Sequence, residues 1–441
     1  MSHRNSPTRV ISEQRASTLK ITAGFKSVFI LALAVSSASA LAQSTPSAGV
    51  SAVNIQPLLS DSTATEGHFS DPYPIHLAPW LEPLLPQSFS GTTKDILTCA
   101  GKIEVDCFQE TAFTVTAGPD LLAEAASVGT DITGTFENSN IYQDSNGEWS
   151  MATTMYVRNL KKFPDVTHWN LIVHAHPTDP FLPTAWVADS VLVGKFSEPN
   201  KADYDGKYFE DAGRLYLIYS KRLTDPNENV AQHDGITAQL LQSPKVPAAV
   251  DAVTLLAPSD VDGGFNSEYF FVDHANNSFK LIETGNITKI GNKYVMAYST
   301  GDYEEPDYKS GLAFSDTFLP TASSSYKRVL KLDTIGIWNQ PGHEEVLYLL
   351  QAEKPLWPNY VASQVKAPGV PSVVHDRSGR YFLYFAGFLP SEATIDPNTG
   401  FFKPALRRPF FITLNVNIPA NTTVEGTPNA ALAGWITTEQ Q

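Results

Sequence analysis

Three acidic residues have the types and the placement that hydrolysis of a glycosidic bond requires. Asp71, Asp205 and Glu283 each stand next to a segment that reads as a β-strand. Such hydrolysis needs one carboxylic acid that protonates the leaving oxygen and one carboxylate that activates water or attacks the sugar. A third carboxylate close to the general acid raises the pKa of that acid and keeps it protonated. The competing interpretations are solvated carboxylates at strand ends and, for Asp71, an ordinary Asp-Pro turn.

A recurring β-hairpin pattern would position these acids. The segment 204–220 reads as a strand, a tight Asp-Ala-Gly-Arg turn and a returning strand of alternating residues. Variants of this pattern occur at residues 141–151, 287–298 and 373–385. A unit of this kind, repeated every several tens of residues, is typical of a radial all-β architecture in which each unit is one antiparallel sheet. Repeats around one axis would send Asp205 and Glu283, which hold nearly the same place in their units, toward one centre.

Composition and the N-terminal segment bound the class of protein. The 441 residues are 42% hydrophobic and 11% aromatic and include 27 Gly and 31 Pro, which suits a large all-β globular body. A basic flank, a short apolar run at 27–35 and an Ala-x-Ala site predict a secretory signal peptide over residues 1–42, cleaved after Ala42. The alternative is an N-terminal anchor, but no long apolar run follows. Residues 43–60, rich in Ser, Thr, Ala and Pro, read as a flexible leader to a single domain at 61–441.

Charge and cysteine content narrow the partners and the compartment. Without residues 1–42 the chain loses five of its 31 basic residues and one of its 46 acidic residues, which leaves a formal charge of −19. Such a charge repels polyanions, so we expect no nucleic-acid partner; we also expect no membrane partner after signal cleavage. Cys99 and Cys107 would close a small disulfide loop in an oxidising compartment. Three glycosylation sequons agree with a secreted, extracellular protein; they start at Asn276, Asn286 and Asn421.

Aromatic and histidine side chains supply further candidates. Trp186, Phe89 and Tyr208 are predicted substrate contacts because aromatic faces can lie against a sugar ring, although most aromatics on such strands are core residues. His174 and His176 alternate on one face of a predicted strand, which would allow a metal pair. Two histidines without a third ligand nearby are more often packing residues, so we predict no metal site there.

The acidic motifs resemble those of a known enzyme family. His68-Phe69-Ser70-Asp71-Pro72, the run from Tyr204 to Leu217, and Ile282-Glu283-Thr284-Gly285-Asn286-Ile287 look like the three acidic motifs of glycoside hydrolase family 43. The order and the spacing are similar too, with 134 positions from Asp71 to Asp205 and 78 from Asp205 to Glu283. The resemblance spans residues 67–416.

The resemblance implies a fold, a reaction and a role for each acid. It implies a five-bladed β-propeller whose central funnel holds the site, with hydrolysis that inverts the anomeric centre. Asp71 would be the general base, Asp205 the modulator of the pKa of the acid, and Glu283 the general acid. Substrates in that family are arabinans, arabinoxylans, xylans and related pentose or furanose glycans, so the expected partner is an oligo- or polysaccharide. We expect a monomer, with insertions that would line the mouth of the funnel at 72–88, 94–136 and 221–265.

Two departures from the family pattern concern the acid and a metal. The chain has Glu283-Thr284-Gly285 where the family often has Glu-Gly-Pro, and Gly369-Val370-Pro371-Ser372 where it often has Gly-His-x-Ser. The family histidine commonly helps to hold a metal or water in the funnel. Val370 cannot do so, which argues against a bound calcium, and His343 is only a weak substitute. We therefore expect that no cofactor is required.

Two other functions stay open on the sequence. A retaining fructan- or sucrose-active propeller enzyme would use Asp71 as nucleophile; carboxyl groups about 5 Å apart favour retention, and roughly 6.5 to 9.5 Å favours inversion. A sugar-binding propeller that has lost catalysis would fit the altered acid and histidine motifs.

Overall fold

The computed structural model describes most of the chain from residue 108 onward and short parts of the chain before it. The described residues are 53–57, 73–74, 81–85, 93–100, 108–180, 185–199, 203–223, 233–258, 271–272, 278–330, 346–353, 359–376, 379–398, 400–403 and 407–439. All of them belong to one compact unit, Ala48–Gln441. The predicted signal peptide lies outside the described residues, as does most of the predicted leader.

The unit is built almost entirely of antiparallel β-strands, which confirms the predicted all-β class. The described strands form three hydrogen-bonded sheets of eight, ten and five strands, and one parallel strand pair joins two groups of strands within each of the two larger sheets. In chain order the strands fall into five groups, which we call blades 1 to 5, and this order is consistent with a five-bladed propeller. Blade 1 consists of β2 (Tyr73–Pro74), β3 (Leu81–Leu85), β4 (Thr93–Ala100) and β5 (Phe108–Ala117). Blade 2 consists of β6 (Asp131–Gln143), β7 (Trp149–Arg158), β8 (Trp169–Pro177) and β9 (Ala185–Val193).

The other three blades follow in chain order. Blade 3 consists of β10 (Tyr204–Asp211), β11 (Arg214–Leu223) and β12 (His233–Ser243), with β13 (Val246–Pro247) and β14 (Val253–Leu256) paired to β12. Blade 4 consists of β16 (Ser278–Ile290), β17 (Lys293–Thr300), β18 (Lys309–Ser315) and β19 (Lys327–Arg328), with β15 (Phe271–Val272) paired to β16. Blade 5 consists of β20 (Lys366–His375), β21 (Tyr381–Phe388) and β22 (Arg408–Val416).

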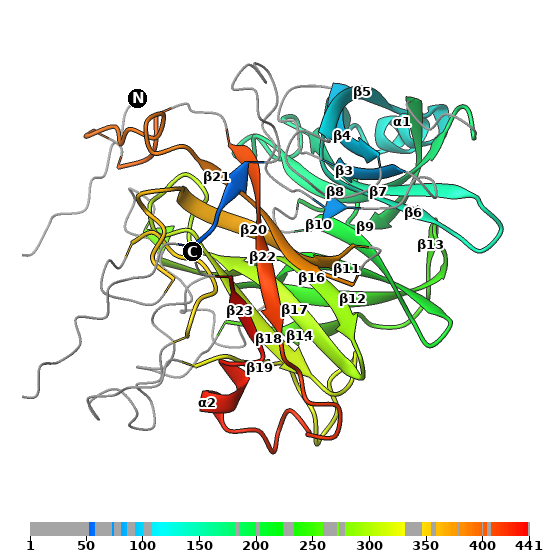
Figure 1. Cartoon of the computed structure of the whole chain (residues 1–441). Coiled ribbons are helices and arrows are strands. Elements are labelled where there is room, and N and C mark those ends of the chain that lie inside the picture. Colours follow the sequence, from blue (N-terminus) through cyan, green and yellow to red (C-terminus); the bar gives the residue numbers. More distant parts are fainter. Residues whose placement is uncertain are drawn as a thin grey trace, which may run out of the picture. The chain divides into compact units, whose positions relative to one another are not determined.

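Strands from the two ends of the described chain complete blade 5. β1 (Gln56–Pro57), blue in Figure 1, pairs with β22, and β23 (Ile436–Thr438) pairs with the far part of β22. Joining both ends of the chain in one sheet is a way to remove free sheet edges from a radial β fold.

Two helices complete the secondary structure of the described residues. Helix α1 (Pro119–Ser127) begins with a proline and an acidic residue in its first turn, and it packs on blade 2 through Leu121 and Ala125, four residues apart on one face. Helix α2 (Asn429–Leu432) is a single turn before β23. No helix in the described part of the chain combines the length and the apolar character that crossing a membrane requires.

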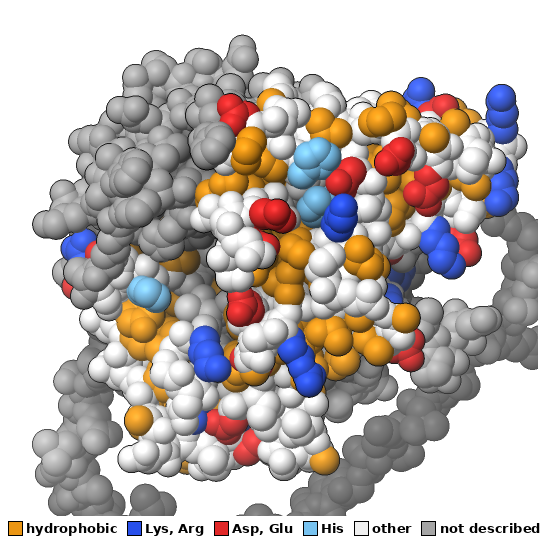
Figure 2. Space-filling model, turned by 90° about the vertical axis from the view of Figure 1, so that its right-hand side faces the viewer, with side chains coloured by type: hydrophobic (Ala, Val, Ile, Leu, Met, Phe, Trp, Pro, Cys, Tyr) orange, Lys and Arg blue, Asp and Glu red, His pale blue; other side chains and the backbone are white. Residues whose placement is uncertain are grey.

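The hairpin around Asp205 forms as predicted. β10 and β11 pair up to Asp211 and Arg214, which leaves Ala212 and Gly213 as a two-residue turn. Both turn residues have positive φ, 51° and 73°, as the type of hairpin turn that matches strand twist requires. Among the described residues on the face shown in Figure 2, Lys and Arg side chains lie scattered among acidic and apolar ones and form no continuous basic surface.

The first long strands of blades 2 to 5 carry the same irregularity. β6, β10, β16 and β20 contact one another in that order, and each has a β-bulge where the register shifts across three residues. This shift starts at Glu137, Tyr204, Glu283 and Gly369, and we call these four the bulge-start residues; β6 and β20 each have one further shift before it. The next residue in each strand has a left-handed backbone, with φ of 50° at Asn138, 60° at Asp205, 55° at Thr284 and 57° at Val370.

Hydroxyl groups of the preceding blade hold three of these left-handed residues. The N–H of Asp205 donates to Thr154 Oγ1 at 3.1 Å, that of Thr284 to Ser220 Oγ at 3.1 Å, and that of Val370 to Ser299 Oγ at 2.7 Å. Left-handed backbone costs a residue other than glycine about 1–2 kcal/mol. The repeated contact between blades offsets that cost and places the bulge-start residues in equivalent positions.

Candidate active site

Glu283 lies at the bulge of β16, between tyrosines of two other segments. The residue is 9% exposed. The Tyr204 hydroxyl donates to Glu283 Oε2 at 2.8 Å, and the Tyr308 hydroxyl donates to Glu283 Oε1 at 2.6 Å. Both carboxylate oxygens therefore have a phenol donor, and the side chain is held in one orientation.

Burial raises the pKa of Glu283 above its usual range. The two tyrosine hydrogen bonds and the positive charge of Arg407 oppose this effect, while the negative charge of Asp234 adds to it. The outcome is a raised pKa. A carboxyl group that stays protonated closer to neutral pH is what a general acid in glycoside hydrolysis needs.

Tyr308 reaches Glu283 because residue 369 has no side chain. A Cβ atom at Gly369 would lie 1.9 Å from Cε1 of the Tyr308 ring. The guanidinium of the buried Arg407 lies 5.2 Å from the centre of the same ring. Gly369 is itself a bulge-start residue, so the Tyr308 ring contacts blade 5 at the position where blade 4 carries Glu283.

Asp205 is buried, with 3% of its surface exposed, and it influences Tyr204, which contacts Glu283. Its negative charge raises the pKa of Tyr204, which burial and Glu283 raise more strongly. The carboxylate that raises the pKa of Glu283 among its main influences is Asp234, not Asp205. Asp234 pairs with Arg222 at 2.9 Å. The assignment of Asp205 as pKa modulator therefore stays a prediction, and Asp234 is a second candidate for that role.

Asp205 and Glu283 lie one position apart in the repeated strand, close to the nearly equivalent places that the sequence predicts. In the bulge register Glu283 corresponds to Tyr204, and Asp205 corresponds to Thr284. The two acids therefore start from adjacent positions of the repeated strand, and Tyr204 rather than Asp205 contacts Glu283.

A second carboxylate–tyrosine pair comes from blade 2. Tyr156 donates to Glu137 Oε2 at 2.7 Å, and burial together with the charges of Glu137 and Asp205 raises the pKa of Tyr156. Burial raises the pKa of Tyr303, and the charges of Glu304, Asp302 and, after them, Glu137 add to this rise. The carbonyl of Tyr303 accepts a hydrogen bond from Arg407 Nη1 at 3.2 Å.

Three hydrogen bonds and several charge effects on pKa values link groups from four blades and their loops into a circuit. It runs from Glu283 through Tyr204, Asp205, Tyr156, Glu137, Tyr303 and Arg407 back to Glu283. Since β6, β10, β16 and β20 contact one another in that order, the strands that carry most of these groups are neighbours. We take these groups as the candidate active site.

The predicted site residues fall into three groups: members of the candidate site, residues outside the described part of the chain, and core residues. Asp205 and Glu283 belong to the candidate site, whereas Asp71 and Phe89 lie outside the described residues. Trp186 is 1% exposed and packs within the core of blade 2, and Tyr208 is 5% exposed and donates to the carbonyl of Pro244 at 2.8 Å. Burial of both rings gives no support to the predicted substrate contacts.

The remaining predictions about cysteines, sequons and histidines have separate outcomes. Cys107 and His343 lie outside the described residues, so the disulfide stays a prediction. The sequon at Asn286 is not a usable acceptor, because that side chain is buried and donates to the carbonyl of Pro371 at 2.8 Å. Asn421 is exposed and remains a candidate, while Asn276 lies outside the described residues.

His174 and His176 both bind one carboxylate. His174 Nδ1 lies 2.6 Å from Asp189 Oδ1, and His176 Nδ1 lies 3.0 Å from Asp189 Oδ2. In the part of the chain that the structure describes, no cluster of three or more His, Cys, Asp or Glu side chains could hold a metal ion. At the position of the family histidine, Val370 presents an apolar side chain and so fits no metal, and the expectation that no cofactor is required stays a prediction.

Sequence reasoning missed five members of the circuit: Tyr204, Tyr156, Glu137, Tyr303 and Arg407. Tyr204 directly precedes Asp205, and Glu137 precedes the first predicted hairpin at the same offset that Glu283 has in its own unit. Aligning the repeats by residues before their turns would have singled out both. Tyr303 and Arg407 lie in loops, and no repeat pattern marks them.

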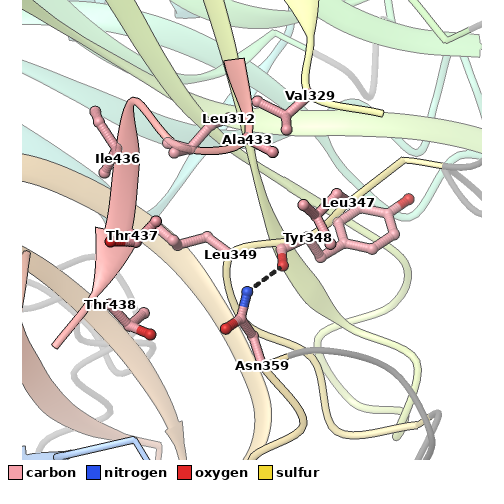
Figure 3. Close-up of a pocket in the computed structure, with 10 residues that line it drawn as sticks. All are labelled: Leu312, Val329, Leu347, Tyr348, Leu349, Asn359, Ala433, Ile436, Thr437 and Thr438. Atoms are coloured by element: carbon pink, nitrogen blue, oxygen red, sulfur yellow. Dashed lines mark hydrogen bonds between the residues drawn. The ribbon is translucent and has the colours of Figure 1, made fainter. Parts of the chain in front are cut away.

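A separate hollow of about 110 Å³ lies between blade 4 and the C-terminal segment. Figure 3 shows Leu312 of β18 facing this hollow together with Ile436, Thr437 and Thr438 of β23, and the amide of Asn359 donating to the carbonyl of Tyr348. None of its lining residues carries a carboxyl group, so it cannot supply the acid–base pair that hydrolysis needs.

Comparison with known proteins yields similarity in structure and none in sequence. No protein-family model matches the sequence, and a search of curated proteins found no match. Among solved structures, an α-L-arabinofuranosidase from Lactobacillus brevis has a TM-score of 0.56 at 14% identity, covering 83% of this chain and 95% of that chain. A thermostable family-43 glycoside hydrolase has a TM-score of 0.53 at 16% identity, covering 86% and 96%.

A third similar structure is an exo-1,5-α-L-arabinanase from a bovine ruminal metagenomic library. Its TM-score is 0.50 at 15% identity, and the alignment covers 86% of this chain and 99% of that chain. Identities this low establish the fold, whereas function depends on the site residues. The chain therefore has the β-propeller fold of family 43 glycoside hydrolases.

Proposed function

We propose that this chain is a glycosidase that hydrolyses pentose- or furanose-containing glycans of the arabinan, arabinoxylan or xylan type. The observation that carries the proposal is Glu283, a buried carboxyl group with a raised pKa that two tyrosines hold at the bulge of β16. The substrate class is supported by the arabinofuranosidase and arabinanase that share the fold.

In the proposed reaction Glu283 gives its proton to the glycosidic oxygen as the bond to the anomeric carbon breaks. Water adds to that carbon and loses a proton to a carboxylate base, for which Asp71 is our candidate. Addition of water from the face opposite the leaving group would invert the anomeric centre.

The charge of the candidate site favours an uncharged glycan. The candidate site contains the carboxyl groups of Glu137, Asp205 and Glu283 and the cation Arg407, whose charge acts on Glu283. Arg222 is paired with Asp234. An excess of carboxylates repels uronic acids and other anionic substituents. We further propose that the protein is secreted after signal cleavage and carries a Cys99–Cys107 disulfide, since both features fit an extracellular glycan substrate.

Purified wild type and Glu283→Gln test the proposal on arabinan, arabinoxylan, xylan and nitrophenyl furanosides, with released sugar as the readout. We expect turnover of at least one substrate by the wild type and a loss of about 10² to 10⁴-fold in Glu283→Gln. No released sugar from any of them would contradict the proposal. NMR of the first product anomer would separate inversion from retention.

The second candidate function is a sugar-binding propeller without catalysis. Val370 and Thr284, which depart from the family pattern, both lie at bulges of the candidate site and favour it. Saccharide binding by the wild type without any turnover would support this alternative.

A further inference from the structure

Ser299 lies directly opposite Glu283 in the sheet of blade 4. The register of β16 and β17 pairs these two residues, at the position where the bulge of β16 begins. Directly opposed residues of antiparallel strands have their Cβ atoms about 4.5–5.5 Å apart on one face of the sheet. Ser299 is fully buried, with 0% of its surface exposed. The candidate acid therefore has a buried serine as its cross-strand neighbour.

Three hydrogen bonds meet at the hydroxyl of Ser299. The N–H of Val370 donates to Ser299 Oγ at 2.7 Å, and Thr284 Oγ1 lies 2.7 Å from the same atom. The third hydrogen bond joins Ser299 to the hydroxyl of Tyr308. All three partners are buried. This hydroxyl thus joins blade 5, the bulge of β16 and a tyrosine that contacts Glu283.

The chemistry of a hydroxyl group fixes the direction of these hydrogen bonds. Burial raises the pKa of Tyr308, and the hydrogen bond with Ser299 acts in the opposite direction, which is the effect of a donor on a phenol oxygen. A serine hydroxyl has one hydrogen and two lone pairs. Since that hydrogen goes to Tyr308, Thr284 must donate to Ser299. The result is a chain of donors that starts at Thr284, passes through Ser299 and Tyr308, and ends at Glu283 Oε1, 2.6 Å from the phenol oxygen.

Such a chain strengthens its last hydrogen bond. A hydroxyl that accepts a hydrogen bond becomes a better donor, by roughly 10–30% per bond. The hydroxyl of Tyr308 also has less freedom to rotate, because Ser299 holds its oxygen. Each carboxylate oxygen accepts at about two positions, so Glu283 can carry a proton while it keeps this contact.

We propose that Ser299 is a positioning residue for the acid: it holds the hydroxyl of Tyr308 on Glu283, from an anchor that Thr284 and Val370 provide. This inference rests on the proposed glycosidase function and deepens it, because it assigns control of the acid to a fully buried residue behind it. As Glu283 gives its proton to the glycosidic oxygen, negative charge develops on its carboxylate. A donor that is already oriented stabilises this charge without reorganisation.

The test follows the titration of Glu283 itself. Full-length protein with ¹³C-labelled glutamate carboxyl groups is titrated by NMR, and the signal of Glu283 is the one that Glu283→Gln lacks. The other groups that act on this carboxyl, Tyr204 of β10, Asp234 of β12 and Arg407 before β22, stay the same in every variant. Because the ionised form loses support, we expect the proton affinity of Glu283 to be about twofold to tenfold higher in Ser299→Ala, so that its pKa rises. An unchanged or lower pKa overturns the proposal.

Ser315→Ala is the matched control. Ser315 is equally buried in the same blade, and its hydroxyl also contacts a backbone N–H, that of Thr317 at 3.2 Å, and a second hydroxyl, that of Ser324 at 3.3 Å. It lies at the end of β18 that is remote from Ser299. We expect the titration of Glu283 in this variant to match that of the wild type.

A second measurement separates a role in catalysis from a role in folding alone. A sugar leaving group needs protonation by the acid, whereas a nitrophenolate needs little. We expect kcat of Ser299→Ala to fall about twofold to tenfold on 1,5-α-arabinobiose or xylobiose, and hardly at all on the matching nitrophenyl glycoside. Equal losses on both kinds of substrate would overturn the positioning role.

A second variant covers the case in which Ser299→Ala fails to fold. Thr284→Ala removes the first hydroxyl of the chain, and Thr284→Ser keeps it. A higher proton affinity of Glu283 in Thr284→Ala alone supports the chain, and equal titrations of the two variants overturn it.

The titration and the hydrolysis assay can fail independently. An unchanged titration in Ser299→Ala, with hydrolysis by the wild type, overturns the role of Ser299 and leaves the glycosidase standing. A raised pKa of Glu283 in Ser299→Ala, with no hydrolysis of any substrate by the wild type, supports the hold of Ser299 on the carboxyl group and contradicts the glycosidase.

Discussion

Removal of the Tyr308 hydroxyl should move the pH dependence of catalysis in a direction that the geometry fixes. Tyr308→Phe keeps the ring against Gly369 and Arg407 but deletes the donor 2.6 Å from Glu283 Oε1. That hydrogen bond stabilises the ionised form of Glu283 and lowers its pKa, against a larger rise from burial. Without the donor the pKa of Glu283 must rise further.

The size of the change follows from the strength of such a bond. A hydrogen bond to a charged group contributes about 1.5–3 kcal/mol, and about 1.4 kcal/mol corresponds to one pH unit. The alkaline limb of kcat/KM against pH reports the group that must be protonated in the free enzyme. We therefore expect this limb to move upward by about one to two pH units in Tyr308→Phe.

The assay is release of arabinose from an arabino-oligosaccharide between pH 4 and 9, with wild type and variant measured together. Tyr326→Phe is the matched control, because Tyr326 is buried in the core and its hydroxyl has no hydrogen-bond partner among the described residues. Its limb should coincide with that of the wild type. An unmoved limb in Tyr308→Phe, or one that moves to lower pH, would refute the assignment of Glu283 as the acid.

Three further predictions concern the scaffold. Gly369→Ala should displace the Tyr308 ring, lower the free energy of unfolding by about 1–3 kcal/mol in urea titrations and reduce activity; an unchanged midpoint with full activity would contradict the close contact. Ala212→Gly, in the exposed turn with φ of 51°, should stabilise the protein by about 1 kcal/mol in thermal unfolding, and a lower Tm would count against the strain argument. Burial raises the pKa of Asp189, but hydrogen bonds from His174 and other neighbours outweigh burial, so the pKa of Asp189 is lowered in the folded protein. The stability that Asp189 contributes is therefore present above the pKa of the unfolded chain and is lost as the pH falls through the pKa of the folded protein. The destabilisation caused by Asp189→Asn should accordingly be largest near pH 6 and shrink toward pH 3; a constant difference would argue against the linkage.

Some features of this protein depend only on short stretches of chain, and the sequence alone determined them. The strand pairing around Ala212 and Gly213 needs only a turn with two left-handed residues between alternating strands, and its prediction is confirmed. The prediction of an all-β class is confirmed because the same hairpin pattern recurs along the chain. Glu283 was found because its motif surrounds it within a few residues.

The environment of Glu283 was decided by tertiary structure alone. Tyr204 and Tyr308 are 79 and 25 residues from Glu283, and Arg407 arrives from the loop before β22. Their convergence depends on bulges whose amides are held by hydroxyls of the preceding blade, a contact that no local pattern encodes. The same packing buries Trp186, because a ring on a strand meets either the neighbouring blade or the funnel and the alternation of residues is identical in both cases. Local chemistry thus marked Glu283 as a candidate acid, while packing between distant blades selected the groups that surround its carboxyl group and shift its pKa.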